Sequence, residues 1–121
     1  NSFVANFIGD SNIYSGTYMG NKKVRFLNKT FDCVDEFEKN EKVDVVVRPE
    51  DVFLVNKGLG QVDGTIISSI FKGVHYEIVV SSEGFDWKIH STLYEEPGRE
   101  VGLSVIPDDI HIMHKMAEEE K

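Results

Sequence analysis

The sequence predicts an all-β protein, a sandwich or a small barrel, built from two tandem β-modules with a short helix at the N-terminus. Two observations carry this prediction. Short runs of β-branched and aromatic residues recur about every eight to twelve residues, with Gly, Pro, Asn and Asp between them. A ten-residue pattern in the first half of the 121-residue chain also recurs in the second half. A chain of this length can bury a core without disulfide support.

The expected helix spans residues 2–9. Ser2 can cap its N-terminus, Gly9 suits the position after its last turn, and the apolar residues between them share one face. Two turns do not persist alone in water, so this face has to pack on a neighbouring surface. We therefore expect residues 1–11 to be a linker helix that joins the β domain to whatever precedes it.

From Asn12 onward the hydrophobic period changes from helical to two. Each expected strand ends at turn residues such as Gly20-Asn21 or Lys72-Gly73. Residues 12–114 then form the β domain, and residues 115–121 form an acidic tail. The expected strands are, in order, 13–19, 24–27, 43–47, 52–55, 61–71, 74–80, 85–89, 101–105 and 110–113.

Two proline turns define the internal repeat. The segment 43–52 aligns with the segment 101–110, which lies 58 positions further on. Both place alternating aliphatic residues before a Pro-acid-Asp turn, and acids in such turns bond nearby backbone N–H groups. Each module, about 12–57 and 58–114, is too small to bury its own apolar face, so we expect the two to pack into one unit. The residues of this structural motif are Arg48, Pro49, Glu50, Asp51, Pro107, Asp108 and Asp109.

The charge of the chain argues against several partners. Thirteen Lys and Arg residues stand against 21 Asp and Glu residues, so the net charge is −8. A surface this acidic repels phosphate backbones and anionic lipid, so we expect neither nucleic-acid binding nor membrane insertion. Cys33 is the one cysteine, which excludes an internal disulfide and indicates a reducing compartment.

No catalytic, cofactor-binding or metal-binding residue is predicted. The glycines of residues 58–64 are spaced GxGxxxG and lead into a strand, whereas a phosphate cradle needs a helix N-terminus. His111 and His114 fall on opposite faces of an expected strand, and neither has a partner ligand at a recognised spacing for zinc.

Three stretches resemble one family. Residues 3–12, FVANFIGDSN, resemble the junction that follows the nucleotide-binding domain in ABC importer ATPases. Residues 47–52, VRPEDV, resemble the signature of the transport-associated OB domain of those proteins, and residues 64–80 resemble its glycine- and aromatic-containing hairpin. The stretches FIGDSNIYSG and PDDIHIM are most similar to the spermidine/putrescine import type.

This resemblance implies an OB-like barrel within the ATP-binding subunit of a polyamine importer. It implies a cytoplasmic homodimer that binds permease subunits at the inner face of the cell membrane. Catalysis in that family belongs to an ATPase domain of the same chain, which uses ATP and Mg²⁺. The fragment itself is therefore expected to have no enzymatic activity and no cofactor, whereas the parent is expected to be a polyamine-transporting ATPase.

Four functions remain open. The first is a regulatory module that dimerises by covering sheet edges. The second, compatible with the first, is recognition of the transported polyamine by carboxylates and an aromatic ring. The third is a barrel of molbindin type that binds small oxyanions, and the fourth is an OB-type nucleic-acid binder; acidity argues against both. The candidate polyamine-binding residues are Glu83, Asp86, Trp87, Glu95 and Glu96.

Overall fold

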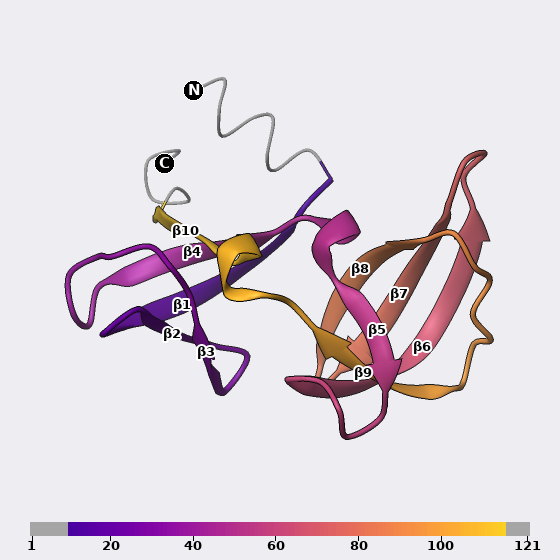
Figure 1. The fold of residues 1–121 in the computed structure, drawn as a ribbon, viewed down its shortest axis with the longest axis horizontal. Coiled ribbons are helices and arrows are strands. Elements are labelled where there is room, and N and C mark those ends of the chain that lie inside the picture. The colour runs from indigo at the N-terminus through magenta and orange to yellow at the C-terminus, as the bar shows by residue number, and fades with distance from the viewer. Residues whose placement is uncertain (1–9, 116–121) are drawn as a thin grey trace. The chain divides into compact units, whose positions relative to one another are not determined.

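The computed structural model describes residues 10–115, which form ten β-strands and two short 3-10 helices (Figure 1). The strands make two five-stranded sheets in which every neighbouring pair is antiparallel. The predicted all-β class is confirmed. The helix expected over residues 2–9 lies outside the described residues. Within residues 10–115, no helix has the length and apolar character that a membrane crossing needs.

Unit 1 consists of residues up to Val47 and from Ile106 onward. Its sheet has the strand order β10-β4-β1-β2-β3. Alternate side chains of β1 and β2 point into the core, where the rings of Tyr14, Phe26 and Phe31 stack with successive centroids 5.8 and 4.2 Å apart. The strands are β1 (Asn12–Gly20), β2 (Lys23–Phe26), β3 (Lys29–Asp32), β4 (Lys42–Val47) and β10 (His111–His114).

Unit 2 is the continuous segment Arg48–Val105. Its sheet has the order β5-β9-β6-β7-β8. Ile66, Ile78, Trp87 and Ile89 are each at most 1% exposed and form its core. Burial of one such side chain contributes roughly 1.5–3 kcal/mol. The strands are β5 (Phe53–Asn56), β6 (Val62–Phe71), β7 (Tyr76–Ser82), β8 (Phe85–Ser91) and β9 (Glu100–Ser104).

The two proline turns have the same backbone. Helix η1 (Pro49–Asp51) and helix η2 (Pro107–Asp109) each begin with the proline at the first position. The residue before each proline is extended, with φ −74° and ψ 143° before Pro49 and φ −73° and ψ 152° before Pro107. In both turns the N–H after the helix donates to the proline carbonyl. The turns therefore make the same bend where the chain passes from one unit to the other.

The unit boundaries differ from those of the modules that the repeat defines. By sequence, β5 belongs to the first module, yet it pairs with β9 in unit 2. By sequence, β10 belongs to the second module, yet it pairs with β4 in unit 1 (Figure 1). The repeat identifies β4 and β9 as equivalent strands. Because their sequence patterns are alike, the local pattern does not indicate which of them pairs with β5 and which pairs with β10.

Candidate functional site

The acidic and aromatic residues singled out from the sequence do not form one site. Glu83 lies in the turn before β8 with φ 52°, and Asp86 is exposed near the start of β8. Glu95 and Glu96 follow the other end of this seven-residue strand, which spans about 23 Å. Trp87 is 1% exposed, so its ring is not available to a cation from solvent.

The burial of Trp87 follows from the alternation along β8. Trp87 and Ile89 lie two positions apart, share one face and are both buried, whereas Asp86 between Phe85 and Trp87 points to solvent. This alternation is visible in the sequence and assigns the tryptophan to the core. The interpretation of Trp87 as a cation-binding ring is therefore wrong.

Glu95 does line a hollow in unit 2. The hollow has a volume of about 210 Å³, and its walls are mostly apolar. The Glu95 carboxylate pairs with Arg99, and the Glu95 backbone N–H donates to Ser69 Oγ at 3.3 Å. Two apolar side chains of the wall are largely exposed, Phe53 at 54% and Leu93 at 67%. The lining residues are Val52, Phe53, Leu54, Ile89, His90, Ser91, Leu93 and Glu95.

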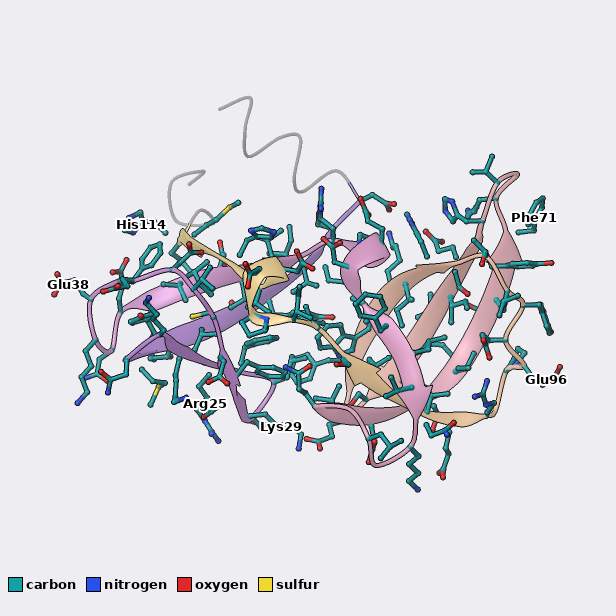
Figure 2. All side chains as sticks on the ribbon, viewed as in Figure 1. Arg25, Lys29, Glu38, Phe71, Glu96 and His114 are labelled. Carbon is teal, nitrogen blue, oxygen red and sulfur yellow. The ribbon has the colours of Figure 1, made fainter. Side chains whose placement is uncertain are left out.

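A second hollow, in unit 1, gathers carboxylates around aromatic rings. We call it the acid–aromatic hollow; its volume is about 340 Å³ and it is lined by Glu36, Phe37, Glu38, Glu41 and His114. The first four come from the segment between β3 and β4, and His114 ends β10. Figure 2 shows Glu38 and His114 at the same end of unit 1.

Hydrogen bonds hold the acid–aromatic hollow together. His114 Nδ1 lies 2.7 Å from Glu41 Oε2, and the Glu38 N–H donates to Glu41 Oε1 at 3.3 Å. The rings of Phe37 and His114 meet edge to face with centroids 4.7 Å apart. Carboxylates beside an aromatic face are the groups that bind ammonium cations. Sequence reasoning missed this set because His114 is 73 positions from Glu41.

The glycines of residues 58–64 pack the chain closely against itself. The Gly58 N–H donates to Asp63 Oδ1 at 2.9 Å, and the Gln61 N–H donates to the Leu103 carbonyl at 2.8 Å. A Cβ on Gly60 would lie 2.3 Å from the Leu103 carbonyl oxygen. The N–H groups of Gly58 and Gln61 are thus used within the protein, and Gly60 permits the contact of this loop with β9.

The first proline turn is held by its acidic side chains, and the second by a backbone hydrogen bond. Arg48 Nε donates to Asp51 Oδ2 at 2.8 Å and lies 3.9 Å from Glu50, so this ion pair fixes η1. In η2 the place of Arg48 is taken by Ile106, and the turn is closed by the Asp109 N–H, which donates to the Ile106 carbonyl at 2.9 Å. These contacts give the motif a structural part in both turns.

Cys33 is not placed for chemistry. It is 4% exposed, and burial, followed by the nearby Asp35 carboxylate, raises the pKa of its thiol. The thiolate is the form that attacks electrophiles and binds metals, so a raised pKa leaves this side chain inert.

Residues 10–115 thus form an all-β domain with two antiparallel sheets and a surface hollow in each unit. The TOBE domain family model matches residues 45–113, more than half of the chain, and the chain belongs to this family.

Curated relatives agree with this assignment. The chain is 53% identical over 116 residues to the spermidine/putrescine import ATP-binding protein PotA of Clostridium acetobutylicum, covering 95% of this chain and 33% of that protein. It is 50% identical to the protein of the same name from Clostridioides difficile, with the same two coverages. The chain thus spans about a third of the length of the curated relatives that it matches.

A solved structure shares the fold. The cytoplasmic molybdate-binding protein ModG superposes with a TM-score of 0.66 over 86% of this chain and 96% of that chain. The sequence identity is 16%, so the likeness shows the OB-like fold alone.

Proposed function

We propose that this chain is the regulatory and dimerising domain of the ATP-binding subunit of an ABC importer for polyamines. One observation carries the proposal: identity near 50% to import ATP-binding proteins extends over 95% of the chain. In this proposal the ATPase domain lies in the same parent chain and uses ATP and Mg²⁺. Permease subunits hold the parent at the inner face of the cell membrane, and the β domain itself does no catalysis.

The importer context has a direct test. The residues encoded upstream of Asn1 are expected to include a phosphate-binding loop, GxxxxGK[ST], on a strand-to-helix turn. Deletion of the gene is expected to abolish uptake of radiolabelled spermidine or putrescine by the cell. An upstream region without a nucleotide-binding loop contradicts the proposal.

Dimerisation is supported by exposed apolar surface on unit 2. Phe53 and Leu93 stand at the hollow that Glu95 lines, and a second copy that covers them removes apolar area from water. A stable interface of this kind needs about 800 Å² from each partner. Sedimentation equilibrium of the chain is expected to show a dimer, and a strict monomer at high concentration rules out dimerisation by this domain alone.

A matched pair of variants locates the interface. Leu93→Asp places a charge in the covered surface and is expected to weaken the dimer at least about tenfold. Val74→Asp makes the same kind of change at an 83% exposed side chain in the β6–β7 turn and is expected to leave the dimer unchanged. If Leu93→Asp and Val74→Asp weaken the dimer equally, the interface does not lie at the surface of Phe53 and Leu93.

The acid–aromatic hollow favours a second function, recognition of a polyamine cation. Three carboxylates and the Phe37 ring line one hollow there, which suits a chain of spaced ammonium groups. Calorimetry with spermidine at low salt is expected to show binding that Glu38→Gln reduces. Glu96→Gln, which removes an acid of the sequence-predicted set, is the matched control. If Glu96→Gln loses binding and Glu38→Gln does not, the polyamine site lies at residues 95–96 and not at the acid–aromatic hollow.

A further inference from the structure

A row of polar and basic side chains crosses one face of the unit 1 sheet. Lys42 of β4 pairs with Thr17 of β1, and Thr17 in turn pairs with Arg25 of β2. Arg25 pairs with Thr30 of β3, so the four residues lie side by side across four neighbouring strands. Because paired residues point to the same face and Tyr18, the neighbour of Thr17, is buried in the core, the row faces solvent. We call these four side chains the basic strip.

The two cations of the basic strip have no acidic partner within residues 10–115. Lys42 Nζ donates to the Thr17 hydroxyl at 3.2 Å, and no carboxylate of the described chain pairs with Lys42 or Arg25. In the neighbouring row, by contrast, Lys23 is paired with Asp32 at 2.5 Å. The chain as a whole carries a net charge of −8. Two uncompensated cations on one face of such a chain form a local positive surface that attracts carboxylates.

The described part of the chain ends beside the basic strip. Lys115 Nζ donates to Ser15 Oγ at 2.5 Å and to Asp44 Oδ1 at 2.8 Å. Ser15 lies two positions before Thr17 in β1, and Asp44 lies two positions after Lys42 in β4, so both point to the face of the strip. The Lys115 side chain therefore lies on this face.

The length of chain beyond Lys115 matches the width of the basic strip. The strands β10 and β2 are separated by β4 and β1, so they lie about 14 Å apart at a spacing of about 4.8 Å per strand. An extended chain advances about 3.3 Å per residue, so the five residues from 116 to 120 span up to about 16 Å. The acidic segment 118–120, Glu-Glu-Glu, is therefore within reach of Lys42 through its first residue and of Arg25 through its last.

We propose that the basic strip binds the acidic segment 118–120 of the same chain. Lys42 and Arg25 supply the opposite charges, and the hydroxyl of Thr30 donates a further hydrogen bond to a carboxylate. Each exposed ion pair contributes little alone. The short tether raises the effective concentration of the three carboxylates at the strip, so the pairs act together. The acidic tail is thereby held across the face of unit 1 and is released when salt screens the charges.

Nuclear magnetic resonance of the whole chain tests this contact. The tail variant E118Q/E119Q/E120Q keeps the length of the acidic tail and removes the negative charge of the segment. We expect it to shift the backbone amide signals of the basic strip at about 0.1 M salt and not at about 1 M, where the screening length falls from about 10 Å to about 3 Å. Shifts confined to the tail and to the end of β10 at both salt concentrations overturn the proposal.

Two background variants of equal charge test the part of the basic strip. Arg25→Gln with Lys42→Gln removes both cations of the strip, so in this background the tail variant is expected to leave the strip signals unchanged. Lys22→Gln with Lys39→Gln removes two exposed cations of unit 1 outside the strip, so in this background the shifts are expected to persist. If both backgrounds abolish the shifts, the effect comes from net charge and the strip has no specific part in it.

A mixed sample distinguishes the tail of the same chain from the tail of a second copy. The isotope-labelled tail variant is combined with an excess of unlabelled wild-type chain. When each strip binds its own tail, the strip signals of the labelled variant stay at the positions that they have in the variant alone. Strip signals that move to their wild-type positions assign the bound tail to a second copy and contradict the proposal. Neither readout requires a polyamine.

Discussion

At the scale of single residues, two glycines occupy equivalent places in the repeat. Gly16 of β1 pairs with Val43, and Gly64 of β6 pairs with Val101, 58 positions beyond Val43. A Cβ on Gly64 would lie 2.6 Å from both the Ser81 carbonyl oxygen and a Val80 methyl. At Gly16 the nearest contacts would be 2.9 and 3.0 Å. Both strands therefore need a residue without a side chain where the next strand approaches.

Alanine at these positions is expected to destabilise the protein to different degrees. Gly64→Ala pushes against backbone and is expected to lower the free energy of unfolding by about 2–3 kcal/mol, and Gly16→Ala by about 1–2 kcal/mol. Urea denaturation followed by circular dichroism measures both. A larger loss for Gly16→Ala than for Gly64→Ala contradicts this account of the close approach.

Cys33 predicts a dependence of stability on pH. Its pKa is raised in the folded state, so the contribution of the protonated thiol is complete below the unfolded pKa and is lost as the pH rises through the folded value. The free energy of unfolding is therefore expected to fall above about pH 8.5 more steeply for the wild type than for Cys33→Val. Equal slopes of the free energy of unfolding against pH for the two proteins, measured by urea titrations at several pH values, contradict the prediction.

Thiol reagents are also expected to modify Cys33 more slowly in the folded protein than in the denatured protein.

At the scale of elements, one carboxylate holds the edge strand β10. Asp35, just beyond β3, accepts a hydrogen bond from the Ile112 N–H at 3.0 Å. Asp35→Ala is expected to lower the free energy of unfolding by about 1.5–3 kcal/mol and to speed hydrogen exchange at Ile112. Asp32→Ala, which removes an exposed pair with Lys23, is the control and is expected to cost at most about 1 kcal/mol. An unchanged rate of hydrogen exchange at the Ile112 amide in Asp35→Ala contradicts the statement that Asp35 holds β10.

The missed strand shows where sequence patterns fail for short elements. Most expected strands correspond to observed ones, but β3 was not among them. It begins after a turn in which Leu27 and Asn28 have φ of 54° and 66°. Such a turn normally uses Gly or Asn-Gly, and leucine at a positive φ gives no warning of it. The hairpin is instead specified by the cross-strand packing of Phe26 and Phe31.

At the scale of the whole molecule, the local sequence pattern predicted the all-β fold class and the internal repeat, but it did not predict which strands pair. Hydrophobic alternation and turn residues identify strands because strand formation depends on residues that are neighbours in the chain. The choice of sheet for β5 and β10 depends on residues far away, such as Asp44 for Lys115. The same limit applies to the acid–aromatic hollow, which joins His114 to the segment before β4.

Two fragments of nearly equal length distinguish the structural unit from the sequence module. Residues 48–105 contain all five strands of the unit 2 sheet, whereas residues 58–114 replace β5 by β10. The first fragment buries the edge of β9 within one chain, so we expect it to fold as a β protein with a cooperative thermal transition. The second leaves that edge open within one chain, so we expect it to be unfolded at low concentration and to gain β structure only as it associates. Circular dichroism across a concentration series compares them. A fragment 58–114 that is folded and monomeric while 48–105 is unfolded shows that the strand order of the sheets does not govern stability.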